Sequence, residues 1–429
     1  MKKLFYVVLD GLGDLPISEL GDKTPLEFAE TPNMDKLAKC GKTGKMYSVA
    51  KCIAPESDTA VISILGYDPY EYYTGRGPLE SYGTELIVND GDLALRANFA
   101  TAKGCDIIDH RVGRDLNTEE AKELAKAINA EVKLTSIPTT FEFKSTTGHR
   151  GVLVIRSKEG KLCGEIENVD PAYYRKGKLS VAKGKEEKFD DIVQESKPVK
   201  DYEKNPEAQN AAKLVNEFVK KSRNVLENHP INHKRAAEGK LKANVILARG
   251  AGDCLPKFPP FKKQFGINFA TFVEMPVERG IAKAMNIEIV ELPQPSGDLA
   301  ADYQLRAKMA LDEIKNYDGL YIHIKGPDEP AHDGKVKEKI KSIELIDKNF
   351  FEPLLADLDL KQAIIAVTAD HSTPCAKKSH SADPVPLLIS GGDVEPDNTT
   401  NFSEKECEKG SLGLIEKGTE LMPKLLSLL

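Results

Sequence analysis

Short apolar runs alternate with helical stretches through the first and last parts of the chain. Runs that are apolar throughout suit parallel strands covered on both faces, and they lie at residues 4–9, 287–292, 319–324, 363–368 and 385–389. The intervening stretches, such as 303–315 and 336–355, have the spacing of amphipathic helices. This alternation predicts an α/β fold, in which a mostly parallel sheet has helices on both faces.

The middle of the chain follows a different pattern. It has β-rich pieces, a clear helical stretch at 118–129, and a highly charged stretch at 183–210 that we expect to be a solvated excursion. A chain of 429 residues is also too long for one ordinary core. We therefore predict an α/β domain made of residues 1–75 and 265–429, split by an inserted α+β domain of residues 76–264.

Charge and cysteine usage exclude several classes of function. A net charge of −7 gives no electrostatic support for coating nucleic acid. The seven cysteines are scattered without a CxxC pair, which is typical of a reducing compartment. The first apolar run is interrupted by Asp10, and no run reaches the roughly 18 apolar residues that a membrane span needs. We expect a cytoplasmic protein without nucleic-acid or membrane partners.

Carboxylate and imidazole side chains stand where the predicted strands end. The carboxyl ends of parallel strands meet at one edge of a sheet, so side chains that follow different strands converge there. Six residues occupy such positions: Asp10, Asp328, His332, Asp370, His371 and His380. Each alone is an ordinary turn or cap residue, but together their carboxylates would repel one another without cations. Six ligands exceed what one four-coordinate zinc takes, so the sequence predicts two divalent metals.

Ser57 lies at the start of a predicted helix, in the segment KCIAPESDTAVISILGY. A serine at this position is an ordinary helix cap on one interpretation. On the other, the helix N-terminus favours an anion, and a serine hydroxyl activated by a nearby metal attacks phosphorus. The neighbouring Asp58 and Thr59 would then support the nucleophile.

Several of these segments together resemble the alkaline phosphatase superfamily: Asp10, the Ser-Asp-Thr helix start at Ser57, GPDEPAHDG, TADHSTP and SHSADPVP. Over nearly the whole chain, including GYDPYEYYTGRGPLES, the sequence is similar to the archaeal type of 2,3-bisphosphoglycerate-independent phosphoglycerate mutases. The resemblance implies an alkaline phosphatase-like core and the interconversion of 3-phosphoglycerate and 2-phosphoglycerate, a step of glycolysis and gluconeogenesis. The phosphoryl group would pass through a phosphoserine at Ser57, with no bisphosphoglycerate primer.

The resemblance also implies how the ligands divide between the two metals. One metal would be held by Asp10, Ser57, Asp370 and His371. The other would be held by Asp328, His332 and His380. Mixed carboxylate and imidazole ligation favours Mn²⁺, with Mg²⁺, Zn²⁺ and Co²⁺ as alternatives. The inserted domain would close over this site and exclude water.

The inserted domain is expected to bind the phosphoglycerate. In DHRVGRDLN, a Gly-Arg-Asp segment resembles one in these mutases, which implies that Arg114 clamps a carboxylate or phosphate while Asp115 contacts glycerate hydroxyls or moves protons. Arg76 is expected to support the hinge. The remaining candidates are a possible acid–base group, His110, and the binding residues His149, Arg150, Arg249 and Lys325.

Other functions remain open at this stage. A metal-dependent phosphohydrolase, or an enzyme that passes the phosphoryl group to another small alcohol, would use the same ligands because it shares the phosphoserine. An inactive scaffold with a relic metal site is a third possibility. The predicted binding arginines of the insertion, Arg114, Arg150 and Arg249, favour the mutase, since a hydrolase with an open site needs no glycerate clamp. The sequence leaves open a monomer or a small homo-oligomer.

Overall fold

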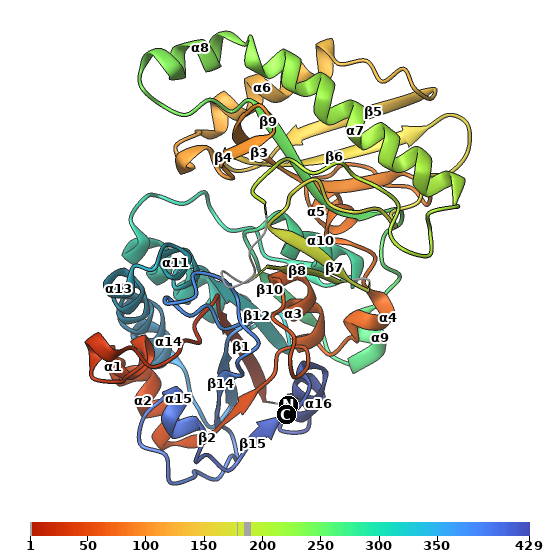
Figure 1. Cartoon of the computed structure of the whole chain (residues 1–429). Helices are drawn as coiled ribbons and strands as arrows, with labels where there is room; N and C mark the ends of the chain where they lie inside the picture. The colour runs from red at the N-terminus through yellow and green to blue at the C-terminus, as the bar shows by residue number, and fades with distance from the viewer. Residues whose placement is uncertain (1, 178, 184–189) are drawn as a thin grey trace.

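The computed structural model describes residues 2–177, 179–183 and 190–429, and its two larger sheets occupy the lower and upper halves of the molecule in Figure 1. The lower sheet has eight strands in the order β11-β10-β12-β1-β13-β14-β2-β15. Their bounds are β1 (Lys3–Leu9), β2 (Gly41–Met46), β10 (Phe269–Phe272), β11 (Glu288–Ile289), β12 (Gly319–Ile324), β13 (Ala363–Thr368), β14 (Val385–Gly391) and β15 (Gly413–Ile415). Only β14 runs antiparallel to its neighbours, so the prediction of a mostly parallel sheet is confirmed.

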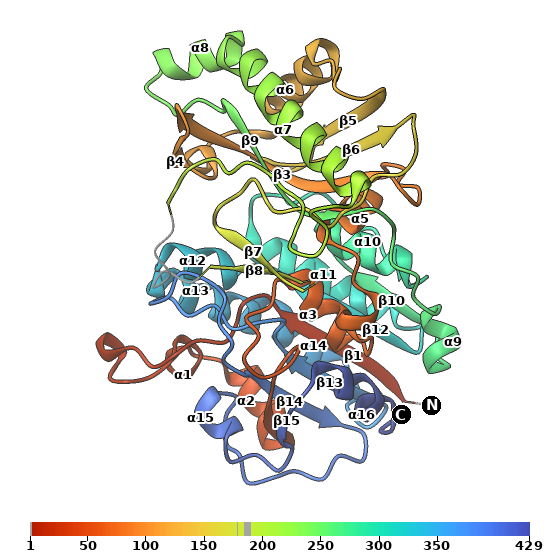
Figure 2. The same ribbon diagram turned by 45° about the vertical axis from the view of Figure 1, so that its right-hand side comes forward.

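Strand β1 lies at the centre of this sheet and is apolar because both of its faces are covered. Residues 4–9 have no exposed surface, and β1 pairs in parallel with both β12 and β13. Helices lie on both faces, as Figures 1 and 2 show. They include α2 (Pro32–Lys39), α3 (Ser57–Ile64), α10 (Pro276–Ala284), α11 (Leu299–Glu313), α13 (Val336–Ile346) and α14 (Glu352–Asp357). The three central strands therefore deliver the residues that follow them to one edge.

The upper sheet is antiparallel and has its own hydrophobic core. Its strands are β3 (Leu93–Lys103), β4 (Asp106–Asp109), β5 (Thr139–Ser145), β6 (Arg150–Ser157) and β9 (Val245–Gly252). The helices of this half are α6 (Thr118–Glu131), α7 (Pro206–Glu227) and α8 (Pro230–Ala237). A hairpin, β7 (Tyr173–Lys176) and β8 (Leu179–Ala182), returns toward the lower half, where Leu179 and Val181 join the larger core. The domain boundaries at residues 76 and 264 stay a prediction.

The two halves also meet where helix α5 (Arg76–Gly83) crosses α10. Gly83 lies against the carbonyl oxygen of Pro276, and Gly280 lies against that of Leu79, so closely that a Cβ atom on either glycine would clash. The helices thus touch backbone to backbone at this crossing. No helix within the described ranges is both long and apolar enough to cross a membrane.

Some elements differ from the sequence-based expectation. The charged stretch 183–210 was expected to be a solvated excursion. Residues 184–189 lie outside the described part, and residues 206–210 begin helix α7, where Ala208 alone is buried and the other four are exposed. Asn205 caps that helix and Pro206 opens it, and its buried side begins at Ala208. The helix expected at 336–355 contains a π-helical segment, Asp347–Phe351, between α13 and α14.

Candidate functional site

The loops after β1, β12 and β13 bring three carboxylates together at the sheet edge. The amide of Gly11 donates to Asp370 Oδ1 at 3.1 Å, which ties the loop after β1 to the loop after β13. Gly11 has a φ of 63°, and a Cβ there would lie 2.6 Å from Asp328 Oδ1. Only glycine fits this position, because the conformation is left-handed and the space is already filled. The convergence predicted for these strand ends is therefore present.

The first group of predicted ligands surrounds the Nε2 atom of His371, and we call its four residues, Asp10, Ser57, Asp370 and His371, the Ser57 cluster. From His371 Nε2 the distances are 3.2 Å to Ser57 Oγ, 3.1 Å to Asp370 Oδ2 and 3.5 Å to Asp10 Oδ1. Ser57 is the first residue of α3, where no side chain caps the helix, so its hydroxyl remains directed at the cluster. One atom of each of the other three residues thus lies within 3.5 Å of His371 Nε2.

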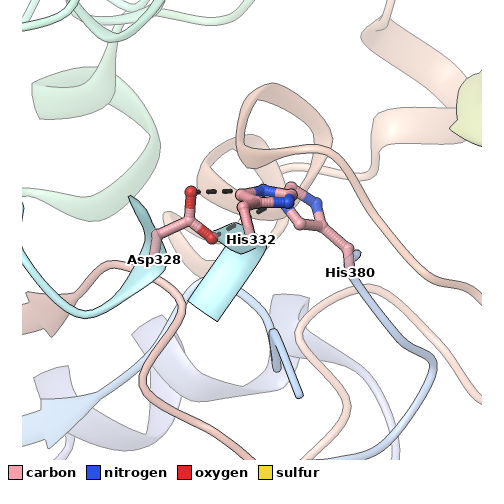
Figure 3. Close-up of side chains that lie close together, drawn as sticks. All are labelled: Asp328, His332 and His380. Atoms are coloured by element: carbon pink, nitrogen blue, oxygen red, sulfur yellow. Dashed lines mark ion pairs between the residues drawn. The ribbon is translucent and has the colours of Figure 1, made fainter. Parts of the chain in front are cut away.

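The second group, the Asp328 cluster of Asp328, His332 and His380, is shown in Figure 3. Its ligand atoms all lie within 4.8 Å of one another. Asp328 and His332 are four residues apart on the short helix α12 (Asp328–Asp333), so they share one face of it. His332 Nε2 lies 3.4 Å from Asp328 Oδ2, and His380 Nε2 lies 3.7 Å from Asp328 Oδ1.

Hydrogen bonds on the far side of the rings fix which nitrogen faces the carboxylate. His332 Nδ1 lies 3.0 Å from the carbonyl oxygen of Lys378, and His380 Nδ1 lies 2.7 Å from that of Pro55. Since a carbonyl oxygen only accepts, each Nδ1 carries a hydrogen and each Nε2 of the neutral ring presents a lone pair toward Asp328. Backbone contacts of this kind orient histidines that bind metals.

Two buried oxygens give an independent test of whether the site fits divalent metals. Among the described residues, Asp10 Oδ1 and Asp370 Oδ2 have no hydrogen-bond partner although neither is exposed to solvent. A buried carboxylate oxygen without a donor is costly unless a cation lies beside it. The two oxygens therefore fit a divalent cation in the Ser57 cluster, and the Asp328 cluster adds a carboxylate and two imidazoles whose ligand atoms lie within 4.8 Å of one another.

The pKa shifts within the clusters reflect the same crowding of negative charge. Burial raises the pKa of the Asp10 carboxyl to about 8, although the Lys325 ammonium opposes the rise. Burial acts to lower the pKa of His371, but the Asp370 carboxylate outweighs it and raises that pKa to about 9. Burial likewise acts to raise the pKa of Asp328, and the two imidazoles of its cluster hold it well below its usual range.

A third group of possible ligands contains His323, which the sequence analysis did not single out as a ligand. His323 is buried on β12, and together with Asp10 and Asp370 it could hold an ion. Lys325 already supplies a cation there: its ammonium lies 2.8 Å from Asp10 Oδ2 and 3.5 Å from His323 Nε2, and it also pairs with Glu278 of α10. The signal for His323 was a titratable residue inside the apolar run GLYIHI.

A cavity of about 460 Å³ lies over both clusters and is walled on its other side by basic residues. These residues, which we call the arginine set, are Arg76, Arg96, Arg111, Arg114, Arg150 and Arg249. Sequence reasoning missed Arg96 and Arg111 and assigned Arg76 to the hinge. The signal for Arg96 was a charged residue within the otherwise apolar strand LALRANFATAK.

The arginine set is only partly neutralised by neighbouring carboxylates. Glu80 accepts from Arg76 Nε at 3.0 Å and, more distantly, from Arg96 Nη1 at 3.5 Å. Arg96 is buried, its Nε has no hydrogen-bond partner in the described part of the chain, and burial together with Arg76 lowers its pKa to about 9. Burial also lowers the pKa of Arg150. An anion entering the cavity would supply the missing negative charge.

The other predicted binding residues divide into two groups. Lys325, Arg114, His149, Arg150 and Arg249 line the cavity, and Asp115 and His110 are absent from its lining. Asp115 pairs with the buried Arg235, and His110 Nε2 lies 2.7 Å from Asp191 Oδ1.

Two of the cavity-lining residues, Arg114 and His149, have surroundings that bear on how they could bind a ligand. Arg114 spans the gap between the halves, because it lies 3.3 Å from Glu329 Oε1 and 2.9 Å from Asp333 Oδ1 on α12. His149 is buried, and burial followed by the charge of Arg150 lowers its pKa to about 3.

Comparisons of the sequence with known proteins point to one family. A sequence model described as 2,3-bisphosphoglycerate-independent phosphoglycerate mutase matches residues 38–232. A protein of that name from Aeropyrum pernix is 43% identical over 100% of this chain and 99% of its own length. Another of that name, from Thermococcus kodakarensis, is 41% identical over 100% of this chain and 97% of its own length.

Solved structures agree with the sequence comparison. A Pyrococcus horikoshii protein of 34% identity superposes with a TM-score of 0.77, covering 100% of this chain and 97% of that one. A cofactor-independent phosphoglycerate mutase from Thermoplasma acidophilum, 31% identical, superposes with a TM-score of 0.61 and covers 100% of both chains. The likeness extends over both sheets.

Proposed function

Since this chain belongs to the family of 2,3-bisphosphoglycerate-independent phosphoglycerate mutases, we propose that it interconverts 3-phosphoglycerate and 2-phosphoglycerate through a phosphoserine at Ser57. One observation carries the proposal. The Ser57 hydroxyl lines a cavity with carboxylate–imidazole clusters on one side and the arginine set on the other. Phosphoryl transfer depends mainly on charge neutralisation and positioning, which both walls of this cavity supply.

Two divalent cations would be held by the Ser57 cluster and the Asp328 cluster, respectively. When bound, they neutralise phosphoryl oxygens and lower the pKa of the serine hydroxyl. The mixture of carboxylate and imidazole donors supports Mn²⁺ as the metal, with Mg²⁺, Zn²⁺ and Co²⁺ as alternatives. No bisphosphoglycerate is required, because the phosphoryl group stays on Ser57 between the two half-reactions.

The reaction consists of two transfers that balance each other. Ser57 Oγ loses its proton and attacks phosphorus, the bond from phosphorus to the C3 oxygen of the substrate breaks, and that oxygen takes up a proton. The glycerate then turns within the cavity, its C2 hydroxyl loses a proton and attacks the phosphoserine, and the bond from phosphorus to Ser57 Oγ breaks, so that Oγ regains a proton. The N-terminus of α3 favours the anionic phosphoryl group while it is attached to Ser57.

The arginine set would hold the glycerate during its turn. Arg96 has a single carboxylate partner, Glu80 at 3.5 Å, and Arg150 has no ion pair within the described chain, which supports both as partners of the substrate carboxylate. His149 lines the same cavity, and its low pKa keeps the imidazole neutral, which supports it as a hydrogen-bonding partner of the substrate. Asp115 and His110 would first have to leave Arg235 and Asp191 to reach the substrate.

A coupled assay tests the proposal directly. The purified protein with Mn²⁺ is given 3-phosphoglycerate, and the 2-phosphoglycerate formed is followed through enolase, without added bisphosphoglycerate. Steady enolase flux is expected. Release of inorganic phosphate in place of 2-phosphoglycerate would reject the mutase and indicate the phosphohydrolase alternative, while transfer to an added small alcohol would indicate a phosphotransferase.

The location and the oligomeric state of the enzyme are proposed from fewer observations. All seven cysteines are free, and three of them are exposed, which supports a reducing, cytoplasmic location. The proposed partner is the small phosphoglycerate substrate alone, with the chain acting as a monomer or a small homo-oligomer. Light scattering on the purified protein measures the oligomeric state.

A further inference from the structure

Thr373 lies between the two ligand clusters without belonging to either. Its hydroxyl donates to Asp328 Oδ1 at 2.8 Å and lies 3.0 Å from His371 Nδ1. A hydroxyl has one hydrogen, which goes to the carboxylate, so the oxygen must accept the hydrogen carried by Nδ1. In the neutral ring, which is the form that binds a metal, the Nε2 atom of His371 therefore presents its lone pair on the side of Asp10 and Asp370.

We propose that Thr373 is a positioning residue that orients one ligand of each metal, and that it thereby couples the affinities of the two metal sites. The inference rests on the two-metal part of the proposed function. Through one hydroxyl, Thr373 fixes the tautomer of His371 in the Ser57 cluster and the orientation of the Asp328 carboxylate in the other cluster. Partners of this kind commonly tune metal sites.

The backbone of Thr373 is itself held in place, so its hydroxyl cannot move to follow a displaced ligand. Its amide donates to the carbonyl oxygen of Gly13 at 2.9 Å, and its carbonyl oxygen accepts from Lys339 Nζ at 3.0 Å. Lys339 is completely buried and also donates to Gly13 O at 3.1 Å and to Asp14 Oδ2 at 2.9 Å. This ammonium joins the loop after β1 to the loop after β13.

Loss of the hydroxyl removes a partner from two groups, the buried Nδ1 of His371 and the carboxylate of Asp328, whose side chain is 22% exposed. The Nδ1 hydrogen of His371 would be unsatisfied, because Thr373 is fully buried and its surroundings exclude water. The ring could then adopt the other tautomer, with a hydrogen on Nε2 where a metal would bind. Removal of such a partner typically weakens metal affinity by about 10- to 100-fold.

A matched set of variants tests the proposal by metal binding alone. Thr373→Val removes the hydroxyl at constant shape, and Thr373→Ser restores it without the methyl group. Thr368→Val is the control, because Thr368 is equally buried on β13 and its hydroxyl donates to the carbonyl of Pro386 outside both clusters. Metal-free protein is titrated with Mn²⁺, and electron paramagnetic resonance measures the free ion. We expect two sites in the wild type, about 10- to 100-fold weaker binding at both in Thr373→Val, and unchanged binding in the other two variants.

Three results would overturn the inference. They are wild-type affinity in Thr373→Val, weakening at one site only, and an equal loss in Thr373→Ser. If Thr373→Val does not fold, nitrogen-15 NMR of histidine-labelled wild type loaded with diamagnetic Zn²⁺ decides the matter, with the His371 signals assigned from their loss in His371→Asn. A hydrogen on Nδ1 supports the proposal, and one on Nε2 overturns it. The coupled mutase assay on wild type separates failure of this inference from failure of the proposed function.

Discussion

Glu56 and Arg249 form a buried ion pair in which Arg249 Nη1 lies 2.8 Å from both carboxylate oxygens. Glu56 immediately precedes Ser57 on the lower half of the molecule, whereas Arg249 lies on β9 of the upper sheet. The guanidinium also stacks on the ring of Tyr173, 3.5 Å from its centroid. The pair therefore connects the proposed nucleophile directly to the opposite wall of the cavity.

Replacing Glu56 by glutamine should destabilise the protein by about 3 to 5 kcal/mol, since the buried Arg249 would lose its close carboxylate partner and Arg76 would keep only Glu80. Urea unfolding measures the change. Glu119→Gln is the control, because Glu119 pairs with Lys122 on the exposed side of α6 and should cost less than about 1 kcal/mol. A loss below about 1 kcal/mol in Glu56→Gln would contradict this account of the pair.

Ser57→Ala should lower turnover by on the order of 10⁴-fold or more, because the proposed phosphoserine cannot form. The protein should remain folded, since the Ser57 side chain does not cap α3. The coupled assay measures the loss, and Ser63→Ala on the same helix is the control. Ser63 is buried, but its hydroxyl has no hydrogen-bond partner within the described chain. Substantial activity in Ser57→Ala would remove this residue from the mechanism.

Arg96→Met should raise the free energy of unfolding of the substrate-free enzyme by about 1 to 3 kcal/mol, because it replaces an incompletely paired buried charge with an apolar side chain. The same change should lower kcat/KM by about 10- to 100-fold through loss of a charged contact to the substrate. Arg235→Met should instead destabilise, since Arg235 is fully paired with Asp115 and Glu120. Destabilisation by Arg96→Met would show that the arginine set is already balanced without an anion.

Removal of metal should lower the melting temperature, because Asp10 and Asp370 of the Ser57 cluster and the neighbouring Asp328 would repel one another. Adding Mn²⁺ at a hundred times its Kd should restore about 2.7 kcal/mol per occupied site. The double variant Asp328→Asn, His332→Asn lacks one cluster and should recover about half as much as the wild type. Scanning calorimetry with and without chelator measures both effects, and identical melting curves would argue against resident metals.

Glu404 should make stability fall as pH rises. Burial raises the pKa of its carboxyl to about 7, so its contribution is complete below the ordinary pKa of about 4.3 and is lost as pH rises through about 7. Glu404→Gln keeps the contacts to Thr24 and Asp14 and should be more stable than the wild type at pH 8 by up to about 3 kcal/mol.

Unfolding with chelator present at several pH values tests this, and Glu406→Gln is the control of opposite sign. A hydrogen bond from Lys409 lowers the pKa of Glu406, so loss of that carboxylate should reduce stability at pH 8. A pH profile in Glu404→Gln that parallels the wild type would contradict the assignment.

The metal clusters could be predicted from sequence because parallel strands bring their ends together whatever lies between them. Asp10, Asp370 and His371 could be placed at the sheet edge from their positions directly after apolar strand runs in the sequence. Arg96 and His323 could not be found this way, since each sits inside an apolar strand and periodicity treats it as part of the core. Strand β10 was missed because four residues give too short a pattern.

The partners of the lid residues depend on tertiary packing that no local pattern encodes. Asp115 was expected at the substrate, yet it pairs with Arg235, which lies far along the chain on α8. Whether Asp115 pairs with Arg235 or contacts a ligand depends on how the upper half packs. His149 shows the converse, since it reaches the cavity only because β6 pairs with β3.

The glycine crossing of α5 and α10 affects how the width of the cavity can change in evolution. Since Gly83 and Gly280 let two peptide backbones meet, the spacing of α5 and α10 is set by main chain and not by adjustable rotamers. A single methyl group at either glycine would force the two helices apart and widen the cavity. Evolution of a wider substrate range could therefore begin at this junction, away from every residue that touches the phosphoryl group.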